Sequence, residues 1–525
     1  MMNQYMNNKA IRYFLYSLAF LPIFIFRDFS PGNELRYLSI ADEALHNGSI
    51  FTFFNHGLIY ADKPPLYLWI VMLGKTIFGY HSMFFLSIFS FVPALVVVYI
   101  MDKWVGNLLS EKERLIGELM LMTCGFFIGT AIVLRMDMLM CMFIVLALYT
   151  FFRMYSGEGK PRDSWLFPIF VFMALFTKGP MGIIVPLVST VAFLILKKEL
   201  KTIGRYWGWK TLTVLIILCG VWFAGVYAEG GSQYLNNLLF NQTVNRAVNS
   251  FHHKEPFYYY FVTIWYSLAP WSFLVIGILW VGLKKRMVST DLERFFLAIT
   301  ISTFAILSLF SSKLAVYLLP AFPFFVYLSL LWFKKLGSPR WMYILVGIPA
   351  GLLCIALPGI IIAPYFISIS ALSSSYVVLF AALILSGTGI LTLRYLYKHH
   401  LNVGIITMGS GMLLAVFTVS LAVSQYNSMI GLSQLCNQAK ETAVKKGGVN
   451  YYYCEMTRAI NLDVYLGKEL KKLRICDLYK ANSPIKRPAI LFTWSKAIER
   501  NDSIQVFIKG KKTCQTGIYY YVEIE

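Results

Sequence analysis

Charged side chains are scarce in this sequence, and acidic ones are scarcer than basic ones. Asp, Glu, Lys and Arg make up 14% of the 525 residues, whereas hydrophobic residues make up 58%. The mean hydropathy of +0.62 excludes a soluble globular protein of this length. The apolar residues form recurrent runs of roughly 17–25, each long enough to cross a bilayer. The sequence therefore predicts a polytopic α-helical membrane protein.

Two other absences narrow the class further. No CxxC pair occurs, which argues against a zinc ribbon. No internal repeat is strong enough to indicate a transporter built from two related halves. What remains is a single helical membrane domain followed by a more polar C-terminal segment.

The net charge of +21 does not indicate a nucleic-acid partner, because the basic residues follow the pattern of a membrane protein. Lys and Arg concentrate in short loops between apolar runs, at residues 102–114, 153–162, 197–210, 284–294, 334–340 and 394–400. These loops alternate with loops that are poor in basic residues. This is the positive-inside pattern, and it predicts that the six basic loops and the N-terminus are cytoplasmic.

We predict about thirteen transmembrane helices, at residues 10–26, 82–101, 115–132, 137–155, 164–177, 180–196, 211–228, 259–282, 294–310, 314–333, 342–363, 376–393 and 402–423. The first has no small-residue cleavage site after it, so we expect a retained helix rather than a signal peptide. The apolar segment 64–78 is expected to be an interfacial helix, because a span there would invert every later loop. An odd number of spans leaves the C-terminus outside.

The predicted organisation is a transmembrane domain over residues 1–423 and a C-terminal extracytoplasmic α/β domain over residues 424–525. The transmembrane domain carries two large outer loops, at residues 27–81 and 229–258. In the C-terminal domain we predict strands at Ala489–Trp494, 503–508 and Tyr519–Ile524, and a helix near 432–445. Its four cysteines, Cys436, Cys454, Cys476 and Cys514, are able to form two disulfides, and three pairings stay open.

The first outer loop, residues 27–65, is unusually rich in ionisable side chains for this chain. It ends in the string YADKPP, where Lys63 follows Asp62 and precedes two prolines that restrict the backbone. An ammonium held in this way at the membrane face suits a lipid phosphate. The simpler interpretation is a lysine that reaches toward headgroups.

Three more polar clusters fall on the outer side. In residues 240–260, Arg246 precedes the adjacent His252 and His253; neighbouring histidines rarely reach one ion, so an interfacial cluster is favoured over a metal site. Lys313 and Tyr317 are four residues apart and are predicted to share a helix face. Asp137 stands beside Arg135 at the outer end of a span, where a structural ion pair is the simplest role.

Together the four clusters place cations, carboxylates and tyrosines around one membrane face. This combination indicates an anionic, lipid-linked substrate and a displacement reaction.

Six segments carry a family resemblance: NELRYLSIADEAL, GLIYADKPPLYLW, LFTKGPMGIIVP, FNQTVNRAVNSFHHKEPFYYY, SLAPW and SSKLAVYLLPAFP. In this order they resemble the aminoarabinose transferase (ArnT-type) branch of polyprenyl-phosphate-dependent glycosyltransferases. That branch has the class C glycosyltransferase (GT-C) fold and is related to protein O-mannosyltransferases.

The resemblance implies that a sugar moves from an undecaprenyl (polyprenyl) phosphate carrier to lipid A, another envelope glycan or a protein. The reaction would occur at the periplasmic face of a bacterial inner membrane, with the N-terminus cytoplasmic and the C-terminus periplasmic. The expected protein is a monomer among membrane lipids, with no nucleic-acid partner. No cofactor is implied with certainty. A divalent metal is possible, and its weak candidate ligands are His252 and His253.

The resemblance also assigns site residues. Lys63, Arg246 and Tyr317 would hold the lipid phosphate, with Lys313 assisting. The sugar and acceptor pocket would be lined by Asn33, Arg36, Tyr37, Tyr60 and Asp137.

Two positions depart from the family pattern. Family members carry Asp where this chain has Asn33, and an amide cannot accept a proton as a carboxylate does. We therefore predict the neighbouring Glu34 as the catalytic base, with Asp62 as the alternative. Thr243 stands where the aminoarabinose enzymes tend to have His, which weakens the transfer of a metal site. A phosphate acceptor, already ionised, would need a weaker base than a sugar hydroxyl.

Two other classes compete with this assignment. A flippase or transporter of a lipid-linked sugar would share the phosphate-binding cations but would more often carry charges deep in its spans. Here we predict the charges at the outer ends, which favours an enzyme. An O-antigen ligase or polymerase uses similar donors, but the YADKPP and SKLxxY strings favour the transferase.

Overall fold

The computed structural model describes residues 8–239, 254–366, 375–479 and 484–525. The chain forms two compact units. The first, called the helical unit here, comprises Met1–Leu21, Ala61–Tyr67 and Phe85–Ser420. The second, the mixed unit, comprises Pro22–Tyr60, Leu68–Phe84 and Leu421–Glu525. The first outer loop is therefore divided: most of it folds with the C-terminal residues, and its end folds with the helices.

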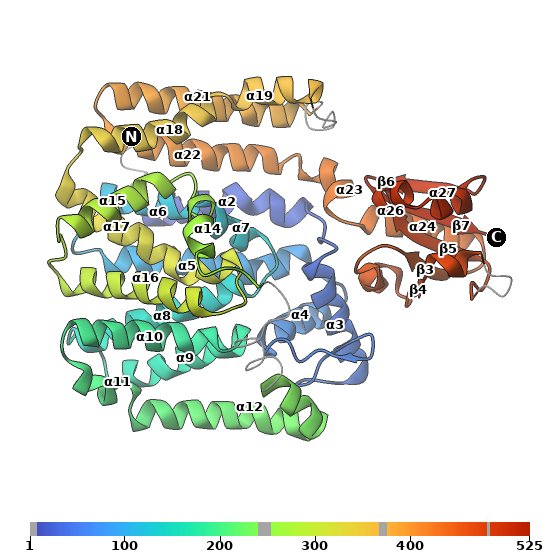
Figure 1. The fold of residues 1–525 in the computed structure, drawn as a ribbon, viewed down its shortest axis with the longest axis horizontal. Helices are drawn as coiled ribbons and strands as arrows, with labels where there is room; N and C mark the ends of the chain where they lie inside the picture. The colour runs from blue at the N-terminus through green and yellow to red at the C-terminus, as the bar shows by residue number, and fades with distance from the viewer. Residues whose placement is uncertain (1–7, 240–253, 367–374, 480–483) are drawn as a thin grey trace. The chain divides into compact units, whose positions relative to one another are not determined.

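The helical unit consists of long apolar helices that run side by side (Figure 1). Its first helices are α2 (Lys9–Phe26), α5 (Met83–Trp104), α6 (Glu111–Met122), α7 (Gly125–Ile132), α8 (Asp137–Tyr155), α9 (Asp163–Lys178) and α10 (Met181–Leu196). They are followed by η1 (Leu200–Ile203), α11 (Gly204–Trp207), α12 (Trp209–Asn236), α14 (Tyr259–Ser267), α15 (Ser272–Lys284), α16 (Asp291–Leu309), η3 (Ala315–Ala321) and α17 (Phe322–Leu336). The last are α18 (Arg340–Cys354), α19 (Ala356–Ile362), η4 (Ala363–Tyr365), α21 (Tyr376–Tyr397) and α22 (Leu401–Ser420).

The prediction of a polytopic helical membrane protein is confirmed, although fewer helices reach full span length than the thirteen expected. Within the described ranges, nine helices are long and apolar enough to cross a membrane, or ten if α6 and α7, which meet at 64°, form one span. The other three predicted ranges hold shorter or interrupted helices. Both α9 and α10 have 16 residues, and the range 259–282 is divided into α14 and α15 around Pro270.

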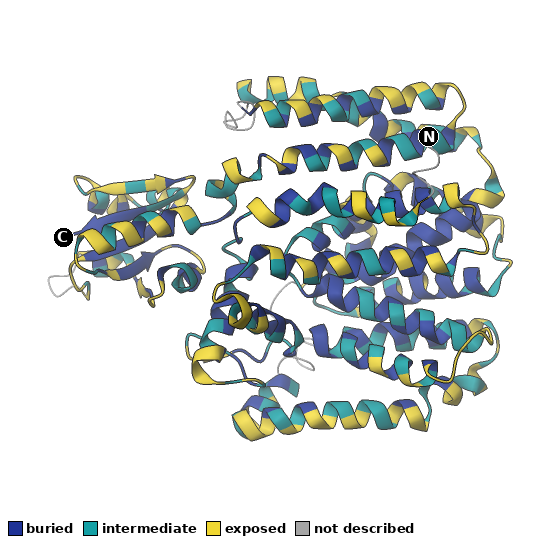
Figure 2. Ribbon diagram, turned by 180° about the vertical axis from the view of Figure 1, so that it is seen from behind, coloured by how far each residue is buried: buried dark blue, intermediate teal, exposed yellow. Residues whose placement is uncertain are grey.

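Figure 2 shows exposed residues along several helices, and many of these residues are apolar, as in helices that contact lipid. In α12, which packs beside α9, Ile216 is 66% exposed and Val221 is 64% exposed. An aqueous surface would make this arrangement costly, since contiguous exposed apolar area is rare in soluble monomers.

One charged pair lies inside the helical unit, contrary to the expectation that charges sit only at outer helix ends. The Arg12 guanidinium of α2 donates to both Glu118 oxygens of α6, each at 2.9 Å. The Tyr16 hydroxyl donates to the same carboxylate at 3.0 Å. Both charged side chains are buried. Each neutralises the other, which is how a low-dielectric interior tolerates ionised groups.

The mixed unit is built on a five-stranded sheet with the order β4-β3-β5-β7-β6. Strand β3 (Asn450–Cys454) pairs in parallel with β4 (Lys471–Leu473) and with β5 (Ala489–Trp494). Strand β7 (Tyr519–Ile524) pairs antiparallel with β5 and with β6 (Thr513–Thr516). The remaining elements are α3 (Asn33–Asn47), the hairpin β1 (Phe54–Asn55) and β2 (Leu58–Ile59), most of α4 (Leu66–Phe78), η5 (Val423–Tyr426), α23 (Asn427–Ile430), α24 (Ser433–Lys445), η6 (Ala459–Leu462), α25 (Asp463–Leu466), η7 (Ile475–Leu478), α26 (Ser495–Arg500) and α27 (Asp502–Ile508).

Helices cover both faces of this sheet. Neighbouring residues of a strand point to opposite sides, so each face packs its own set of side chains against helices. Tyr452, Leu491 and Val522 share an apolar cluster with Ala497 of α26 and Ile504 of α27. On the other side, Thr442 of α24 forms a hydrogen bond of 3.0 Å with the hydroxyl of Tyr521. The result is a small three-layer α/β arrangement.

The predicted strands at Ala489–Trp494 and Tyr519–Ile524 are confirmed, as is the helix near 432–445. The predicted strand at 503–508 is wrong, because these residues belong to α27. Ile504 and Phe507, three residues apart, are the buried pair, and that spacing matches one face of a helix.

The two disulfides that the sequence allows among Cys436, Cys454, Cys476 and Cys514 are not formed, since all four thiols are free. The sheet order keeps one possible pair apart. Cys454 lies on β3 and Cys514 on β6, with two strands between, so the two are roughly 14 Å apart at ~4.8 Å per strand. A disulfide requires Cα atoms within about 7 Å.

Candidate active site

A cavity of about 390 Å³ in the helical unit is lined by two of the residues predicted for the lipid phosphate, Lys63 and Tyr317. Its walls come from residues 61–64, α8, the turn between α9 and α10, α12 with the residues after it, α16, and the segment leading into η3. Apolar side chains such as Trp222, Phe223 and Leu307 form most of the surface. The polar groups that line it are Asp62, Lys63, Lys178, Ser312 and Tyr317. A cavity with one apolar wall and a few cations fits an amphiphile with an anionic head.

Lys178 is a cation of this cavity that an ion pair holds in place. It is the last residue of α9, and its ammonium donates to the buried carboxylate of Asp137 at the start of α8. Arg135 donates to the other carboxylate oxygen at 2.9 Å. The following residue, Gly179, has φ 102°, a conformation that favours glycine and lets the chain turn directly into α10.

The Lys178 ammonium also lies 4.7 Å from the centre of the Tyr317 ring, a cation–π contact. This contact orients a tyrosine that lines the cavity. The predicted ion pair of Asp137 with Arg135 is therefore present, and it extends to a lysine that sequence analysis did not assign. The available signal was the string LFTKGP, in which one lysine ends an apolar run just before Gly-Pro.

Lys63 and Asp62 line the same cavity from the segment that precedes α4. Both side chains are half-buried, and Pro64 and Pro65 follow directly. The prolines restrict the backbone that follows Lys63. The structure thus brings Lys63, Asp62 and Tyr317 together, as the motifs predicted.

Lys313 does not share a helix face with Tyr317, and that prediction is wrong. The residue before it, Ser312, forms a bridge with Lys254, and helix η3 begins only at Ala315. Lys313 is buried, and its ammonium donates to the backbone carbonyl of Glu255 at 2.8 Å. Its observed role is to fasten two chain segments together.

The predicted base Glu34 lies in the mixed unit and is held by its neighbours. Its two carboxylate oxygens accept hydrogen bonds from the Arg27 guanidinium at 2.8 and 2.9 Å. The backbone N–H of Ser30 donates to it at 2.7 Å. The side chain is 1% exposed. A carboxylate in this position stabilises the start of α3, and burial keeps it from a substrate.

The remaining predicted pocket residues surround Arg36. Its guanidinium donates to the Asn33 side-chain oxygen at 3.1 Å. It also lies 5.8 Å from the Tyr37 ring centre and 5.5 Å from that of Tyr60. Arg458, from the C-terminal part of the mixed unit, donates to the same Asn33 oxygen at 3.3 Å. The structure brings together Asn33, Arg36, Tyr37 and Tyr60 and adds Arg458, which sequence analysis missed.

Polar contacts also join α3 to the C-terminal part of the mixed unit. The Ser39 hydroxyl donates to Asp463 at 3.0 Å and lies 3.2 Å from His56. Burial raises the pKa of Asp463, and nearby His56 and the Ser39 hydrogen bond oppose that rise. The Tyr465 hydroxyl donates to Asp28 at 2.6 Å; burial and this carboxylate raise the pKa of Tyr465. These links position the site-bearing start of α3.

Arg246, His252 and His253 lie outside the described residues. In the part of the chain that the structure covers, no three His, Cys, Asp or Glu side chains gather as metal ligands would. Both the divalent metal and the phosphate-holding role of Arg246 stay predictions.

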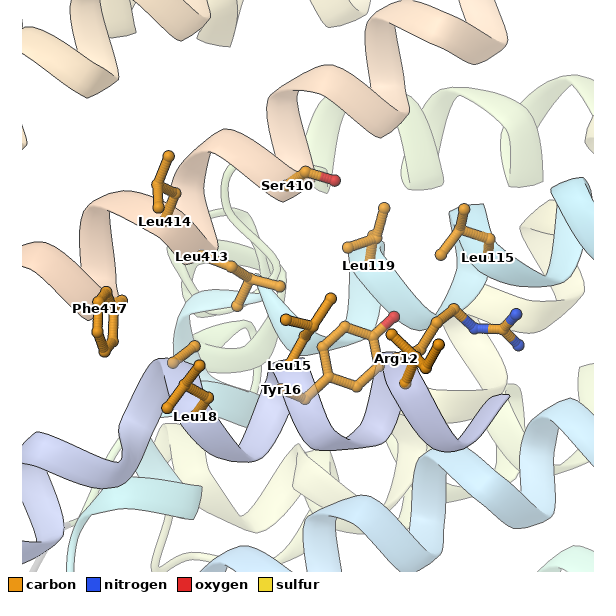
Figure 3. A pocket seen from close by; sticks show the side chains of 12 residues that line it. Arg12, Leu15, Tyr16, Leu18, Leu115, Leu119, Ser410, Leu413, Leu414 and Phe417 are labelled. Carbon is orange, nitrogen blue, oxygen red and sulfur yellow. The ribbon is translucent and has the colours of Figure 1, made fainter. Parts of the chain in front are cut away.

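A second cavity, of about 470 Å³, lies between α2, α6 and α22 (Figure 3). Leucines make up half of its lining residues, including Leu15, Leu119 and Leu413. Its charged residue, Arg12, is already engaged by Glu118. A sugar phosphate would lose its hydration here without gaining partners, so this cavity is a poor active site.

Comparison with known proteins shows the fold first. A family model described as dolichyl-phosphate-mannose-protein mannosyltransferase matches residues 62–223. The fold resembles the crystal structure of ArnT from Cupriavidus metallidurans bound to undecaprenyl phosphate, with a TM-score of 0.74, 15% identity and 98% of each chain covered. The class C glycosyltransferase fold predicted from the motifs is confirmed.

Within that class, the chain is similar to the aminoarabinose transferases. It is 25% identical over 296 residues to the undecaprenyl phosphate-alpha-4-amino-4-deoxy-L-arabinose arabinosyl transferase of Edwardsiella ictaluri, covering 55% of this chain and 53% of the relative. It is 29% identical over 318 residues to an uncharacterized protein of Aquifex aeolicus, covering 58% of this chain and 61% of the relative. The chain thus spans less than two thirds of the length of these relatives, and the predicted ArnT-type resemblance is confirmed.

Removing the Asp137 carboxylate should destabilise the protein, because it would leave Lys178 and Arg135 without their shared anion. Breaking a buried ion pair costs on the order of 3–5 kcal/mol. We expect Asp137→Ala to lower the unfolding temperature of the purified protein in detergent clearly, and Asp62→Ala, at the half-buried cavity wall, to lower it much less. Equal losses in the two variants would contradict this assignment.

Proposed function

We propose that this protein is an integral membrane glycosyltransferase that uses a sugar linked to undecaprenyl or another polyprenyl phosphate. The observation that carries the proposal is the 390 Å³ cavity, in which Lys63, Lys178 and Tyr317 meet a wall of apolar side chains. A polyprenyl phosphate is an amphiphile of this kind. The similarity to proteins named as undecaprenyl-phosphate arabinosyl transferases supports the same donor class.

In the proposed reaction, an acceptor oxygen attacks the anomeric carbon of the sugar while the bond from that carbon to the phosphate oxygen breaks. Negative charge collects on the departing lipid phosphate. Lys63 and Tyr317, which line the cavity, would bind that phosphate, and the charge of Lys178 would add to the positive potential around it. Arg246 would contribute a further contact, as the family resemblance implies. Trp222 and Phe223 would pack against the isoprenoid chain.

We assign the catalytic base to Asp62, the alternative in the sequence analysis, and not to Glu34. Glu34 is buried and bonded to Arg27 and Ser30, so it lacks the reach that a base needs. Asp62 lines the cavity beside Lys63 and is half-buried. We therefore propose Asp62 as the carboxylate that accepts the acceptor's proton.

The proposed acceptor is lipid A, with another envelope glycan or a protein hydroxyl as the alternatives. We also propose that the protein is a monomer and that it can use a divalent metal. A lipid-linked sugar transporter is less well supported. Such a protein would more often carry charged residues deep in its spans, and here the buried charges Arg12 and Glu118 form an ion pair with each other.

We also propose a bacterial inner-membrane location, with the domain of residues 424–525 in the periplasm and the N-terminus in the cytoplasm. The alternation of basic and non-basic loops supports it. A reporter that functions only in the cytoplasm should be inactive when fused after Glu525. Activity of that fusion would mean that the number of spans is even.

Loss of the Lys63 ammonium should weaken donor binding. One charge-assisted contact to a poorly solvated phosphate is worth about 1.5–3 kcal/mol, or roughly tenfold to over a hundredfold in affinity. We expect Lys63→Ala to raise the KM for the lipid-linked sugar by that factor in detergent assays. Lys471→Ala, an exposed lysine of β4, serves as the control. Normal kinetics in Lys63→Ala would remove this residue from the site.

The two carboxylates can be separated by isosteric amides. Asp62→Asn removes basicity with little change in shape, so turnover should fall by about a hundredfold or more while donor binding changes little. Glu34→Gln should instead lower the unfolding temperature, because Arg27 loses its charged partner. A well-folded Glu34→Gln enzyme that binds donor but fails in turnover would restore Glu34 as the base. Normal turnover in both would indicate an acceptor that needs no base.

A further inference from the structure

A small polar pocket of about 40 Å³ lies where α11 leads into α12, and the proposed sugar transfer does not use it. It is lined by Met154 near the end of α8, Ser164 near the start of α9 and residues of the segment 204–211. The volume exceeds the ~10–15 Å³ that one water needs, so a small oxyanion group has room here. The two charged side chains of its lining, Arg205 and Lys210, are both basic.

Lys210 is held at the pocket without losing its charge. Its ammonium donates to the Ser164 hydroxyl at 2.7 Å and lies 4.2 Å from the centre of the Trp165 ring. The Ser164 hydroxyl donates in turn to the carbonyl of Pro161 at 2.8 Å. An ammonium has three donors, and the hydroxyl takes one of them. The lysine is therefore oriented by neutral groups and stays positive.

Arg205 supplies the second cation from α11. Burial raises the pKa of Tyr206, and the adjacent Arg205 guanidinium opposes that rise. In the part of the chain that the structure describes, no carboxylate forms an ion pair with Arg205 or with Lys210. Asp163, which directly precedes Ser164, is paired with Arg153 at 3.3 Å. A pocket with two cations and no partner carboxylate is suited to an anionic oxygen ligand.

The loops that carry the pocket are basic as a whole. Residues 153–163 and 197–210 together contain eight Lys or Arg side chains and three Asp or Glu side chains. Both loops belong to the set that the positive-inside pattern assigns to the cytoplasm. Anionic lipids give the cytoplasmic leaflet a negative surface potential, and this potential attracts basic segments close to the membrane.

Exposed apolar side chains continue from the pocket along α12. Trp209 is 81% exposed, Leu212 is 46% exposed and Ile216 is 66% exposed. Their spacing of three and four residues places them on one face of the helix. Trp165, beside Lys210, is 52% exposed, and tryptophans are enriched at the level of lipid headgroups. A free phosphate would not contact this apolar face, whereas the acyl chains of a phospholipid would.

From these observations we infer that the pocket binds the headgroup phosphate of an anionic phospholipid, whose acyl chains lie along the exposed face of α12. Basic pockets between membrane helices on the cytoplasmic side bind lipids of this kind. Arg205 and Lys210 donate to the phosphate oxygens, and Trp209 packs at the headgroup level. The site is separate from the proposed sugar transfer, since it shares no lining residue with the 390 Å³ cavity.

The bound lipid also has a structural consequence. The pocket joins the end of α8 and the start of α9 to the start of α12, and α12 packs beside α9. A lipid that contacts all three helix ends binds the folded protein and not the unfolded chain, so it stabilises the folded state.

The experiment measures lipid binding to the full-length protein in detergent by native mass spectrometry. The probes are dioleoyl phosphatidylglycerol, which is anionic, and dioleoyl phosphatidylcholine, which has the same chains and no net charge. We expect the wild type to prefer phosphatidylglycerol. Arg205→Gln and Lys210→Gln should each weaken its binding about fivefold, the effect of one basic side chain near a membrane surface. Lys201→Gln removes an exposed lysine of the same loop that does not line the pocket, and it should bind like the wild type.

Equal losses in all three variants would mean diffuse attraction by the basic loops and would overturn the pocket assignment. Unchanged binding in Arg205→Gln and Lys210→Gln, or a wild type without preference for phosphatidylglycerol, overturns it as well. Soluble glycerol phosphate should compete poorly, because it has no acyl chains. If it displaces the lipid at equal concentration, the ligand is a free phosphate and the lipid assignment is wrong.

Unfolding temperatures give an independent readout. Without added lipid, the three variants should unfold near the wild-type temperature, because the substituted side chains are exposed. Added phosphatidylglycerol should raise the unfolding temperature of the wild type and of Lys201→Gln more than that of Arg205→Gln or Lys210→Gln. An equal rise in all four proteins contradicts the inference. Failure of sugar transfer with this lipid preference intact would contradict only the proposed function.

Discussion

The shared carboxylate of Asp137 is the constraint on which the cavity of the helical unit depends. A carboxylate buried among membrane-spanning helices must be paired, because an isolated charge there costs several kcal/mol. The structure meets this requirement with Arg135 and with Lys178 from the end of α9. The pairing fixes where α9 ends relative to α8, and Gly179 then allows the immediate turn into α10. The wall of the cavity is a consequence of that ion pair.

In the mixed unit, too, carboxylates hold separate chain segments together. Asp28 accepts hydrogen bonds from the backbone of Ser433 at 2.9 Å and from Tyr465, and so joins the first loop to the C-terminal segment. Close packing accompanies these bonds: a Cβ on Gly431 would lie 2.1 Å from an Asp28 oxygen. Anions in this chain are few, and the described ones of this region mostly hold the chain together.

Local patterns predicted the elements well, whereas partners distant in sequence could not be predicted. Hydropathy found the helices, and alternation found β5 and β7, but the same alternation misassigned α27, where burial follows a three-residue spacing. The motifs assigned Lys63 and Tyr317 to one phosphate site, and both residues line the same cavity. Lys178 was missed because a lysine at the end of an apolar run commonly reaches toward headgroups. The engagement of Glu34 by Arg27 depends on how the chain folds back before α3, which no periodicity reveals.

The difference between an amide and a carboxylate at position 33 changes the charge around Arg36 and Arg458. With a carboxylate there, Arg36 and Arg458 would form an internal ion pair network, and the same oxygen would be available as a base. With the amide of Asn33, the two arginines keep their geometry through hydrogen bonds and ring contacts but keep their charge as well. In the proposed mechanism the proton-accepting carboxylate is Asp62, which lines the cavity with Lys63. The amide thus leaves this arginine pair of the mixed unit without a carboxylate at position 33, and the proposed mechanism assigns proton transfer to a carboxylate of the helical unit instead.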